Sequence, residues 1–556
     1  MKLQYKNIQT YIAAAIVSAS LFSCSEDTMD GINKDVDNPH SVDAKYILTD
    51  VITSTAFSNI GGSNDFYFAS NVEHEVGVFN QLYNYEMRSG ETFASSTFNN
   101  QWNGLYSTLM NARIIVDKCS DNGSEAGNYT TKGMGEVLAA LNAGLIADAW
   151  GDTPYSQAAL AQLNNGRPLY MNPAIDKQED IYKDIIAQLD AAIADLPKGD
   201  KSGPAAQDVL FKGNADKWLK LAYGLKARYT MHTLNRASDK TAALKAVIEY
   251  CGKAAQSTAD QAAFGTGIYD GKTNKNPLYD FFCSREYLGG SHSLAKKLVD
   301  MKDPRQYCTF VSAVLDANDF TGTAGTQLDL TQTYKKDEKS DAVSPIDKMA
   351  PNGGSELVQD LEYYNTSIFL FASTAPTFLM SYHEVKFLEA EAYARLGDTD
   401  KAWEALQAAV TAGLENVNVS IEAALATDLS TEFPKIGFIT AGSHSTITAE
   451  DIAAYLPIVK ARFDANALKE VILQKYLAFW GANGESTECY NDVRRLKGEG
   501  HFDYYALENP ANAKNLFPLR APYGNSAVTS NPNVQSAYGD GKYIFTEPVW
   551  WAGGSR

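Results

Sequence analysis

The chain has 556 residues and carries 48 Lys and Arg against 67 Asp and Glu, which gives a formal net charge of −19. This acidic balance repels phosphate backbones and anionic membrane surfaces, and no Lys/Arg run is longer than a pair. We therefore do not expect a general nucleic-acid-binding protein. A composition with 45% apolar and 21% charged residues is typical of a globular protein and excludes global disorder.

The N-terminus has the pattern of a secretory signal. Two lysines precede the uncharged stretch 8–22, which is apolar but too short to span a bilayer. Leu21-Phe22-Ser23-Cys24 resembles a bacterial lipobox, in which the cysteine is lipidated and becomes the first residue of the mature protein. We therefore expect a lipoprotein signal peptide at residues 1–23 and a lipid anchor at Cys24.

The residues directly after the lipobox indicate where the protein is carried. Ser25-Glu26-Asp27 resembles the surface-export signal of lipoproteins in the Bacteroidetes group. The expected location is the outer membrane, with the protein lipid-anchored and facing the extracellular side. Acyl chains contribute about 0.8 kcal/mol per buried CH₂, so several chains hold such a protein without a transmembrane helix.

The remaining cysteines do not form a recognisable site. Cys119, Cys251, Cys283, Cys308 and Cys489 are widely scattered, and the sequence has no CxxC pair and no Cys/His cluster. Zinc and dithiol redox chemistry therefore have no support. We expect mostly buried, small apolar side chains, and a Cys283–Cys308 disulfide stays open.

Helical periodicity dominates the mature chain. Ile181, Ile185, Leu189, Ile193 and Leu196 recur at nearly four-residue spacing, and Pro197 ends the run. The same pattern predicts helices over 137–150, 218–234, 242–255, 384–396, 402–410 and 448–480.

Most of these helices come in pairs. A helix that ends at Leu396 turns through Gly397 and restarts with Ala402 and Ala409 seven residues apart, which is the small-residue packing of tetratricopeptide hairpins. The pairs have no regular period between them. We therefore expect an all-α-dominated fold of tetratricopeptide-like helix hairpins in one bundle, interrupted by long irregular loops.

Three long segments lack a sustained helical pattern, and they are 265–293, 318–371 and the last fifty residues from Asn509. Structureless segments of this length in a compact domain usually carry function. No low-complexity linker divides the chain, so residues 24–556 are predicted to form a single domain.

Several short motifs follow one another in a set order. The most specific is 151–158 (GDTPYSQA), which comes after an Ala-rich helix. The others are Trp102-x-x-Leu105-Tyr106, Trp218 to Arg228, Asp303-Pro304-Arg305, Glu384 to Ala392, Tyr490 to Arg495 and the proline-rich tail with Pro518 and Asn531-Pro532-Asn533. In this order, with the lipoprotein signal, they resemble the SusD/RagB family of outer-membrane nutrient-binding lipoproteins over nearly all of residues 24–556.

The motif residues themselves also have structural explanations. Gly151 suits the end of a helix and Pro154 prevents its continuation. Asp303 is suited to capping a turn, and Arg494 and Arg495 to pairing with carboxylates. We expect all of these residues to determine the fold and not to contact a ligand.

The resemblance implies a function in nutrient uptake. Members of this family form a lid over a TonB-dependent (SusC-like) barrel and hold the nutrient between lid and barrel. The implied partners are this barrel, an oligosaccharide or oligopeptide ligand and the membrane through the N-terminal lipid, with no nucleic acid and no cofactor. Oligosaccharides are favoured on the family's general record, and oligopeptides are a close alternative.

Two other classes of protein are alternatives to a nutrient-binding lipoprotein. A surface-tethered hydrolase would need catalytic residues that a motif identifies, but no motif singles out a pair of carboxylates for glycoside hydrolysis. The pairs His74-Glu75 and His383-Glu384 lack the second histidine one turn later that a zinc peptidase requires, and no G-x-S-x-G motif occurs. We therefore expect no enzyme. A helical-repeat interaction scaffold is the second alternative, and the long aromatic loops argue against it.

Ligand contacts are expected in two aromatic segments. The segment 66–98 lies about where the family's ligand loop lies, and its candidates are Tyr83, Tyr85, Arg88 and Phe93. A second segment offers Tyr269, Tyr279 and Tyr287. For any one of these aromatic residues, burial in the core is favoured over ligand contact, and no metal site can be predicted.

Overall fold

The computed structural model describes residues 42–556 except 165, 313–323, 336 and 355–363. The chain divides into two units, 1–43 and 44–556, and of the first unit only the exposed Val42 and Asp43 are described. The predicted signal peptide at 1–23 and the lipidation site at Cys24 lie outside the described residues. The extent of the domain from residue 24 therefore stays a prediction.

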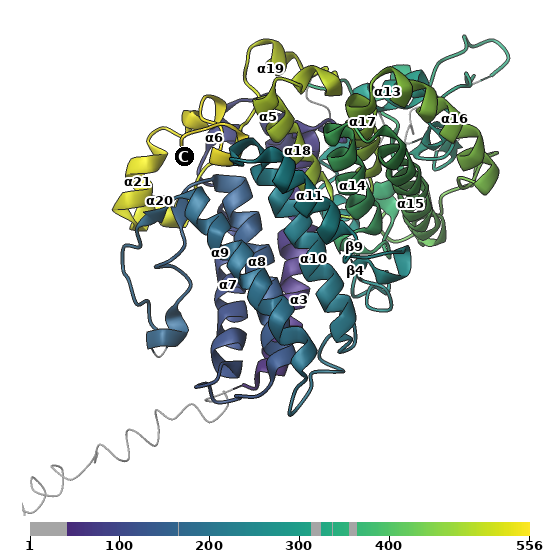
Figure 1. The fold of residues 1–556 in the computed structure, drawn as a ribbon. Coiled ribbons are helices and arrows are strands. Elements are labelled where there is room, and N and C mark those ends of the chain that lie inside the picture. The colour runs from purple at the N-terminus through teal and green to yellow at the C-terminus, as the bar shows by residue number, and fades with distance from the viewer. Residues whose placement is uncertain (1–41, 165, 313–323, 336, 355–363) are drawn as a thin grey trace, which may run out of the picture. The chain divides into compact units, whose positions relative to one another are not determined.

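Helices form most of the second unit, which confirms the predicted all-α-dominated fold (Figure 1). The helices before residue 252 are α3 (Ala44–Thr53), α4 (Ser63–Asn71), α5 (Asn80–Glu86), α6 (Gly90–Phe93), α7 (Asn99–Cys119), α8 (Tyr129–Trp150), α9 (Gln178–Asp195), α10 (Ala215–His232) and α11 (Lys240–Cys251). Those after it are α12 (Pro277–Arg285), α13 (His292–Met301), α14 (Tyr382–Leu396), α15 (Thr399–Ala426), α16 (Ala449–Ala465), α17 (Ala467–Ala478), α18 (Ser486–Glu499), α19 (Pro510–Ala513), α20 (Asn525–Ser530) and α21 (Pro532–Tyr538).

Consecutive long helices pack against each other as hairpins. The most extensive contacts between elements are those of α7 with α8, α8 with α9, α10 with α11 and α14 with α15. Gly397 ends α14 with a left-handed φ of 81°, a conformation that favours glycine. Ala402 and Ala409 are both fully buried, so the predicted small-residue packing of this hairpin is confirmed.

The strands are short and connect distant parts of the unit. They are β1 (Glu75–Gly77), β2 (Thr153–Pro154), β3 (Ile175–Asp176), β4 (Ala262–Phe264), β5 (Leu288–Gly290), β6 (Phe310–Val311), β7 (Gln327–Leu328), β8 (Thr366–Ser367) and β9 (Thr377–Met380). Within the described ranges they form the antiparallel pairs β1–β5, β2–β3 and β4–β9 and the three-stranded sheet β7–β6–β8.

Three predicted segments differ from the observed elements. The last fifty residues from Asn509, expected to be irregular, contain α19, α20 and α21. In α19 and α21 a proline stands in a first turn that an asparagine caps, as Asn531 does for α21 by accepting from Asn533 N at 3.0 Å.

The helical run expected over 448–480 is divided into α16 and α17, because Asn466 leaves the helical conformation with a φ of −160° and its side chain caps α17 by accepting a hydrogen bond from Lys469 N at 3.0 Å. The segment 265–293, expected to be a loop, contains α12. Asn276 caps that helix by accepting from Leu278 N at 2.9 Å, and Pro277 occupies its first turn.

The core is apolar but includes buried charges. Trp150, Trp218, Trp480 and Trp551 are among the largest fully buried side chains. Arg495 is also fully buried and pairs through both terminal nitrogens with Glu391, at 2.7 and 2.9 Å. All five described cysteines are free thiols, so Cys283 and Cys308 are not joined. In the part of the chain that the structure describes, no helix has both the length and the apolar character needed to cross a bilayer.

Candidate functional site

The two predicted ligand segments meet where β1 pairs with β5. Val76 lies opposite Gly289 in the antiparallel register, and Val78 N donates a hydrogen bond to Tyr287 O at 2.9 Å just beyond it. A Cβ on Gly77 would lie 2.1 Å from Leu82 O, so the close approach of α5 to β1 requires glycine there. The segments around residues 80 and 287 therefore form one surface.

Aromatic rings cover this surface. The Tyr287 ring lies 5.6 Å from Phe79 and 6.4 Å from Phe281, centroid to centroid. Asn80 Nδ2 donates a hydrogen bond to the Tyr287 hydroxyl at 3.1 Å. Phe79 and Phe281 are half-buried, while Asn80 is exposed. We call Phe79, Asn80, Tyr83, Phe281 and Tyr287 the aromatic surface.

Tyr83 and Tyr85 lie on the same short helix but have different surroundings. Tyr83 N donates to Phe79 O at 3.2 Å, which places Tyr83 one helical turn after Phe79. Tyr83 is half-buried, and its hydroxyl has no hydrogen-bond partner among the described residues. Tyr85 is 1% exposed, packs 4.7 Å from the Tyr67 ring and accepts a hydrogen bond from Asn71 Nδ2 at 2.9 Å. Tyr85 thus belongs to the core that supports α5.

Arg88 lies directly after α5 and is buried. Its backbone has a left-handed φ of 53°, and its Nη1 donates to Tyr85 O at 3.2 Å. Its Nε and Nη2 have no partner within the described ranges. Burial raises the pKa of the neighbouring Glu86 carboxyl, and the Arg88 charge opposes that rise. Unsatisfied buried donors are costly, so Arg88 is able to donate to an oxygen that reaches it.

The other predicted site residues lie elsewhere. Phe93 packs 6.3 Å from Phe545 in the C-terminal tail. Tyr269 is 7% exposed, and its hydroxyl is 3.1 Å from Thr377 Oγ1. Tyr279 precedes Phe281 by two residues on α12 and so projects from a nearly opposite face of that helix. Of the seven candidates, Tyr287 is 9% exposed and packs on Phe79, Tyr83 is half-buried one turn after Phe79, and Tyr85 and Arg88 are buried around α5.

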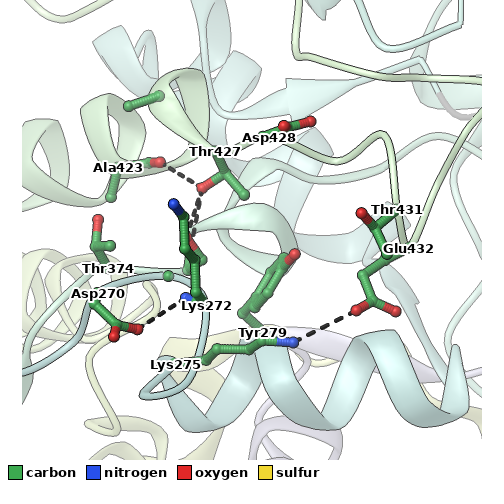
Figure 2. A pocket seen from close by; sticks show the side chains of 13 residues that line it. Asp270, Lys272, Lys275, Tyr279, Thr374, Ala423, Thr427, Asp428, Thr431 and Glu432 are labelled. Atoms are coloured by element: carbon green, nitrogen blue, oxygen red, sulfur yellow. Dashed lines mark hydrogen bonds and ion pairs between the residues drawn. The ribbon is translucent and has the colours of Figure 1, made fainter.

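Tyr279 instead lines a polar pocket with a volume of about 460 Å³. Figure 2 shows its ring beside the ion pair of Lys275 and Glu432, whose Nζ and Oε1 atoms are 3.5 Å apart. Asp270 accepts hydrogen bonds from the backbone N of Lys272, Thr273 and Asn274, and these bonds lower the pKa of its carboxyl. The pocket also borders the C-terminal end of α15. Its lining has three carboxylates and two lysines, so a neutral or cationic ligand suits it better than an anion.

The sequence did not predict some residues of the aromatic surface and of the polar pocket around Tyr279. Phe281 and Asn80 acquire their roles only through the β1–β5 pairing, and Lys272, Thr374 and Glu432 enter the pocket from three separate segments. A signal was available only for the aromatic residues, because their density in 66–98 and 265–293 is visible in the sequence.

A buried cluster of Asp148, His232 and Glu488 has the residue types of a metal site, with ligand atoms within 4.8 Å of one another. His232 Nε2 lies 3.1 Å from Glu488 Oε2, and Trp551 Nε1 donates to Asp148 Oδ1 at 3.0 Å. Burial lowers the pKa of His232, but the two carboxylates outweigh it and raise that pKa to about 9. Tyr182 Oη also contacts both Asp148 Oδ1 and His232 Nδ1, so these side chains form one buried hydrogen-bonded network.

The motif residues of the sequence are also used inside the fold. Gly151 ends α8 with a φ of 76°, and Asp152 Oδ1 accepts from Gln178 N at 2.8 Å, which joins the turn to α9. Arg305 donates to both carboxylate oxygens of Asp303, at 2.8 and 2.7 Å. These residues determine the fold, as predicted.

The chain matches a SusD-like family model, described as starch-binding and associating with the outer membrane, over residues 37–523. No curated protein matches the chain.

Solved structures match along almost the whole length. A SusD/RagB family protein from Bacteroides thetaiotaomicron is 47% identical with a TM-score of 0.82, and the match covers 93% of this chain and 100% of that one. A SusD homologue from Bacteroides fragilis is 20% identical with a TM-score of 0.62, covering 89% and 96% of the two chains. A chitin-binding SusD homologue from Flavobacterium johnsoniae is 18% identical with a TM-score of 0.56, covering 92% and 98%. The last two show a similar fold.

Proposed function

Because the chain belongs to the SusD-like family of outer-membrane-associated proteins, we propose that it is a surface lipoprotein that binds an oligomeric nutrient and caps a TonB-dependent, SusC-like outer-membrane importer. The nutrient we favour is an oligosaccharide, with an oligopeptide as the alternative. Proteins of this family are binding proteins and not enzymes. The family associates with the outer membrane at the cell surface.

The aromatic surface is the observation that carries this proposal. Sugars present apolar ring faces and many hydroxyls, so they need flat aromatic rings next to uncharged donors and acceptors. Phe79 and Phe281 supply half-buried rings, Asn80 supplies an exposed amide, and the Tyr83 hydroxyl has no partner among the described residues. The rings are held in place by packing, which lowers the ordering cost of binding.

The proposed location depends on a lipid anchor. In our proposal Cys24 carries the lipid, and the chain from residue 24 faces the cell exterior. The variant Cys24→Ala should lose acyl-lipid labelling and leave the membrane fraction, while deletion of residues 25–27 should preserve labelling and reduce protease accessibility on whole cells. Unchanged lipid labelling of Cys24→Ala would contradict the anchor.

The ligand site is tested with two pairs of substitutions. Asn80→Ala with Tyr83→Ala alters the aromatic surface at exposed or half-buried positions, and Lys272→Ala with Thr374→Ala alters the polar pocket at exposed positions. We expect calorimetric titration with a panel of oligosaccharides and oligopeptides to show a loss of about tenfold in affinity for the first pair only, equivalent to about 1.4 kcal/mol. The melting temperatures of both should stay near that of the wild type.

Each other result has a defined meaning. Loss of affinity only in the pocket variant would move the ligand to the pocket of Tyr279. Normal affinity in both variants would place the ligand at neither. Turnover of a polymer by the purified protein would favour the surface-tethered hydrolase. Co-purification, in mild detergent, of partner proteins other than a barrel would favour the interaction scaffold.

A further inference from the structure

A pocket of about 340 Å³ lies where the C-terminal end of α13 meets α16, and we call it the α13–α16 pocket. Both helices contact the turn Pro304–Tyr307, and Arg462 Nη1 on α16 donates to Met301 O of α13 at 2.9 Å. None of its lining residues belongs to the aromatic surface or to the pocket of Tyr279. Its volume is within the range of small-ligand sites, about 300–1,000 Å³. The α13–α16 pocket is therefore a separate place with room for a small ligand.

The turn Pro304–Tyr307 forms one wall of this pocket and is firmly held. Asp303 caps the turn by accepting a hydrogen bond from Arg305 N at 3.0 Å. The Arg305 side chain is 1% exposed and pairs with both carboxylate oxygens of Asp303. Residues three apart in such a tight turn lie on the same side, and Pro304 and Tyr307 both border the pocket. A buried ion pair thus fixes the wall.

Gln306, in the same turn, is the observation that points to a ligand. It is 3% exposed and lines the pocket. Its backbone is used by the fold, because Leu330 N donates to Gln306 O at 2.9 Å. Its side-chain amide has no hydrogen-bond partner among the described residues. An enclosed amide without partners is costly, so Gln306 offers a donor and an acceptor, side by side, to a group that enters the pocket.

Tyr307 adds an aromatic ring and a hydroxyl. The residue is half-buried, and the ring of His444 packs against it with centroids 5.0 Å apart. This contact restricts the ring and so reduces the ordering cost of binding. The Tyr307 hydroxyl has no hydrogen-bond partner within the described ranges. The turn therefore presents two side chains whose polar groups are available next to each other in the sequence.

The opposite lining comes from one face of α16. Asp451, Ala454, Tyr455 and Ile458 line the pocket at the spacing i, i+3, i+4 and i+7. The polar groups on this face are already used, since Asp451 Oδ2 accepts from Thr448 N and Oγ1, both at 2.8 Å, and the Tyr455 hydroxyl accepts hydrogen bonds from the fold. What α16 offers to a ligand is the apolar surface of Ala454 and Ile458.

The charge of the lining is balanced. Lys302, at the end of α13, and Asp451 are the two charged residues that line the pocket. One charge of each sign favours neither an anion nor a cation. The pocket thus suits a neutral ligand that has one apolar face and several hydrogen-bonding groups.

We propose that the α13–α16 pocket is a second saccharide-binding site, which takes a neutral sugar unit. The Gln306 amide donates to one sugar hydroxyl and accepts from a neighbouring one, the Tyr307 hydroxyl adds a further hydrogen bond, and the apolar ring face packs on Ala454 and Ile458. The inference rests on the proposed function for the class of ligand, and it adds a site outside the aromatic surface.

An extended peptide fits this pocket less well. A peptide backbone is bound by a row of donors and acceptors, such as an open strand edge provides. The pocket provides one side-chain amide instead. Two neighbouring sugar hydroxyls, each of which both donates and accepts, match a single amide.

The test uses the purified full-length lipoprotein in a detergent without a sugar headgroup. The probes are radiolabelled maltose, cellobiose and N,N′-diacetylchitobiose, with trialanine as a peptide probe, and equilibrium dialysis counts the molecules bound per chain. Ala454→Trp fills the pocket, and Gln306→Met removes the amide at nearly constant side-chain length. The matched control is Ala453→Trp, at the preceding exposed position of α16, which does not line the pocket.

For at least one disaccharide we expect two molecules per chain of the wild type and of Ala453→Trp. Each pocket variant should bind one, which corresponds to a loss of at least tenfold in affinity at this site. The melting temperatures should be unchanged. If both tryptophan variants lose one molecule, the bulky ring disturbs α16, and Gln306→Met then decides. Two molecules bound to Gln306→Met would overturn the inference.

The remaining outcomes separate the inference from the proposed function. If the wild type binds one disaccharide and only Asn80→Ala with Tyr83→Ala removes it, the inference is overturned while the proposed function stands. If only the pocket variants remove it, the inference stands and the aromatic surface is not the ligand site. If the wild type binds no disaccharide, or if the pocket variants lose only trialanine, the inference is overturned and the proposed function keeps its oligopeptide form.

Discussion

Two regions of the molecule use their polar groups in different ways. One is the buried network around α10, α14 and α18, and the other is the aromatic surface at β1 and β5. In the network, Arg228 pairs with Glu384 and Arg495 with Glu391, and all four side chains are buried. On the aromatic surface, Asn80 is exposed and the Tyr83 hydroxyl has no partner among the described residues. These four motif residues are thus committed to the fold, and the aromatic surface, where we propose that the ligand binds, lies outside the motifs.

The largest expected effect comes from breaking the network. Arg495→Ala leaves Glu391 buried with Arg395 as its one remaining direct ion-pair partner among the described residues, and removal of one partner of a buried ion pair typically costs about 3–5 kcal/mol. We expect this loss in the free energy of unfolding, measured with urea. The control Lys245→Ala, at an exposed position on α11, should change it by less than about 0.5 kcal/mol. Equal values for the two variants would remove the network from the determinants of stability.

Two tyrosines on α5 reproduce the same contrast within one helix. Tyr85→Ala removes a fully enclosed ring and should destabilise the protein by about 3–5 kcal/mol. Tyr83→Ala, two residues earlier and half-buried, should cost less than about 1 kcal/mol and weaken ligand binding. Thermal unfolding and calorimetric titration of both variants separate the two roles. A large loss of stability in Tyr83→Ala would place it in the core with Tyr85.

The sequence predicted the long helices better than the aromatic surface. The apolar spacing of Ile181, Ile185 and Leu189 defined α9, and all three side chains are fully buried. Helical periodicity is a local property, so it is visible in a short window. The division of 448–480 was missed because one side chain, Asn466, ends the helical run by capping the next helix.

The aromatic surface depends on contacts that no local pattern contains. β1 and β5 have three residues each and are separated by more than two hundred residues, so neither shows an alternating pattern that would pair it with the other. The burial of Tyr85 and the partial exposure of Tyr83 likewise follow from how α5 packs on β1, not from composition. The sequence therefore indicated aromatic segments, and only the fold selects which residues face outward.

The pH dependence of the free energy of unfolding tests the buried charged groups around His232. Burial lowers the pKa of His232, but Asp148 and Glu488 raise it to about 9 from its ordinary value of 6.5. A raised folded-state pKa gives stabilisation that is complete below about pH 6.5 and is lost as the pH rises towards 9. The shift corresponds to about 3 kcal/mol. Urea unfolding of the wild type at pH 6 and pH 9.5 should show this loss, and His232→Gln should not. A similar decline in both proteins would assign it to other groups.

The smallest expected effect comes from removing one hydroxyl group from the aromatic surface. Tyr287→Phe keeps the ring against Phe79 and Phe281 and removes only the hydroxyl that accepts a hydrogen bond from Asn80 Nδ2. Because Asn80 is exposed, water replaces this bond, and the free energy of unfolding should change by less than about 0.5 kcal/mol. If the ligand stacks on the rings, its affinity should fall by less than about threefold, since the aromatic faces are unchanged. A tenfold loss of affinity with normal stability would instead show that the hydroxyl, or the Asn80 orientation it fixes, binds the ligand directly.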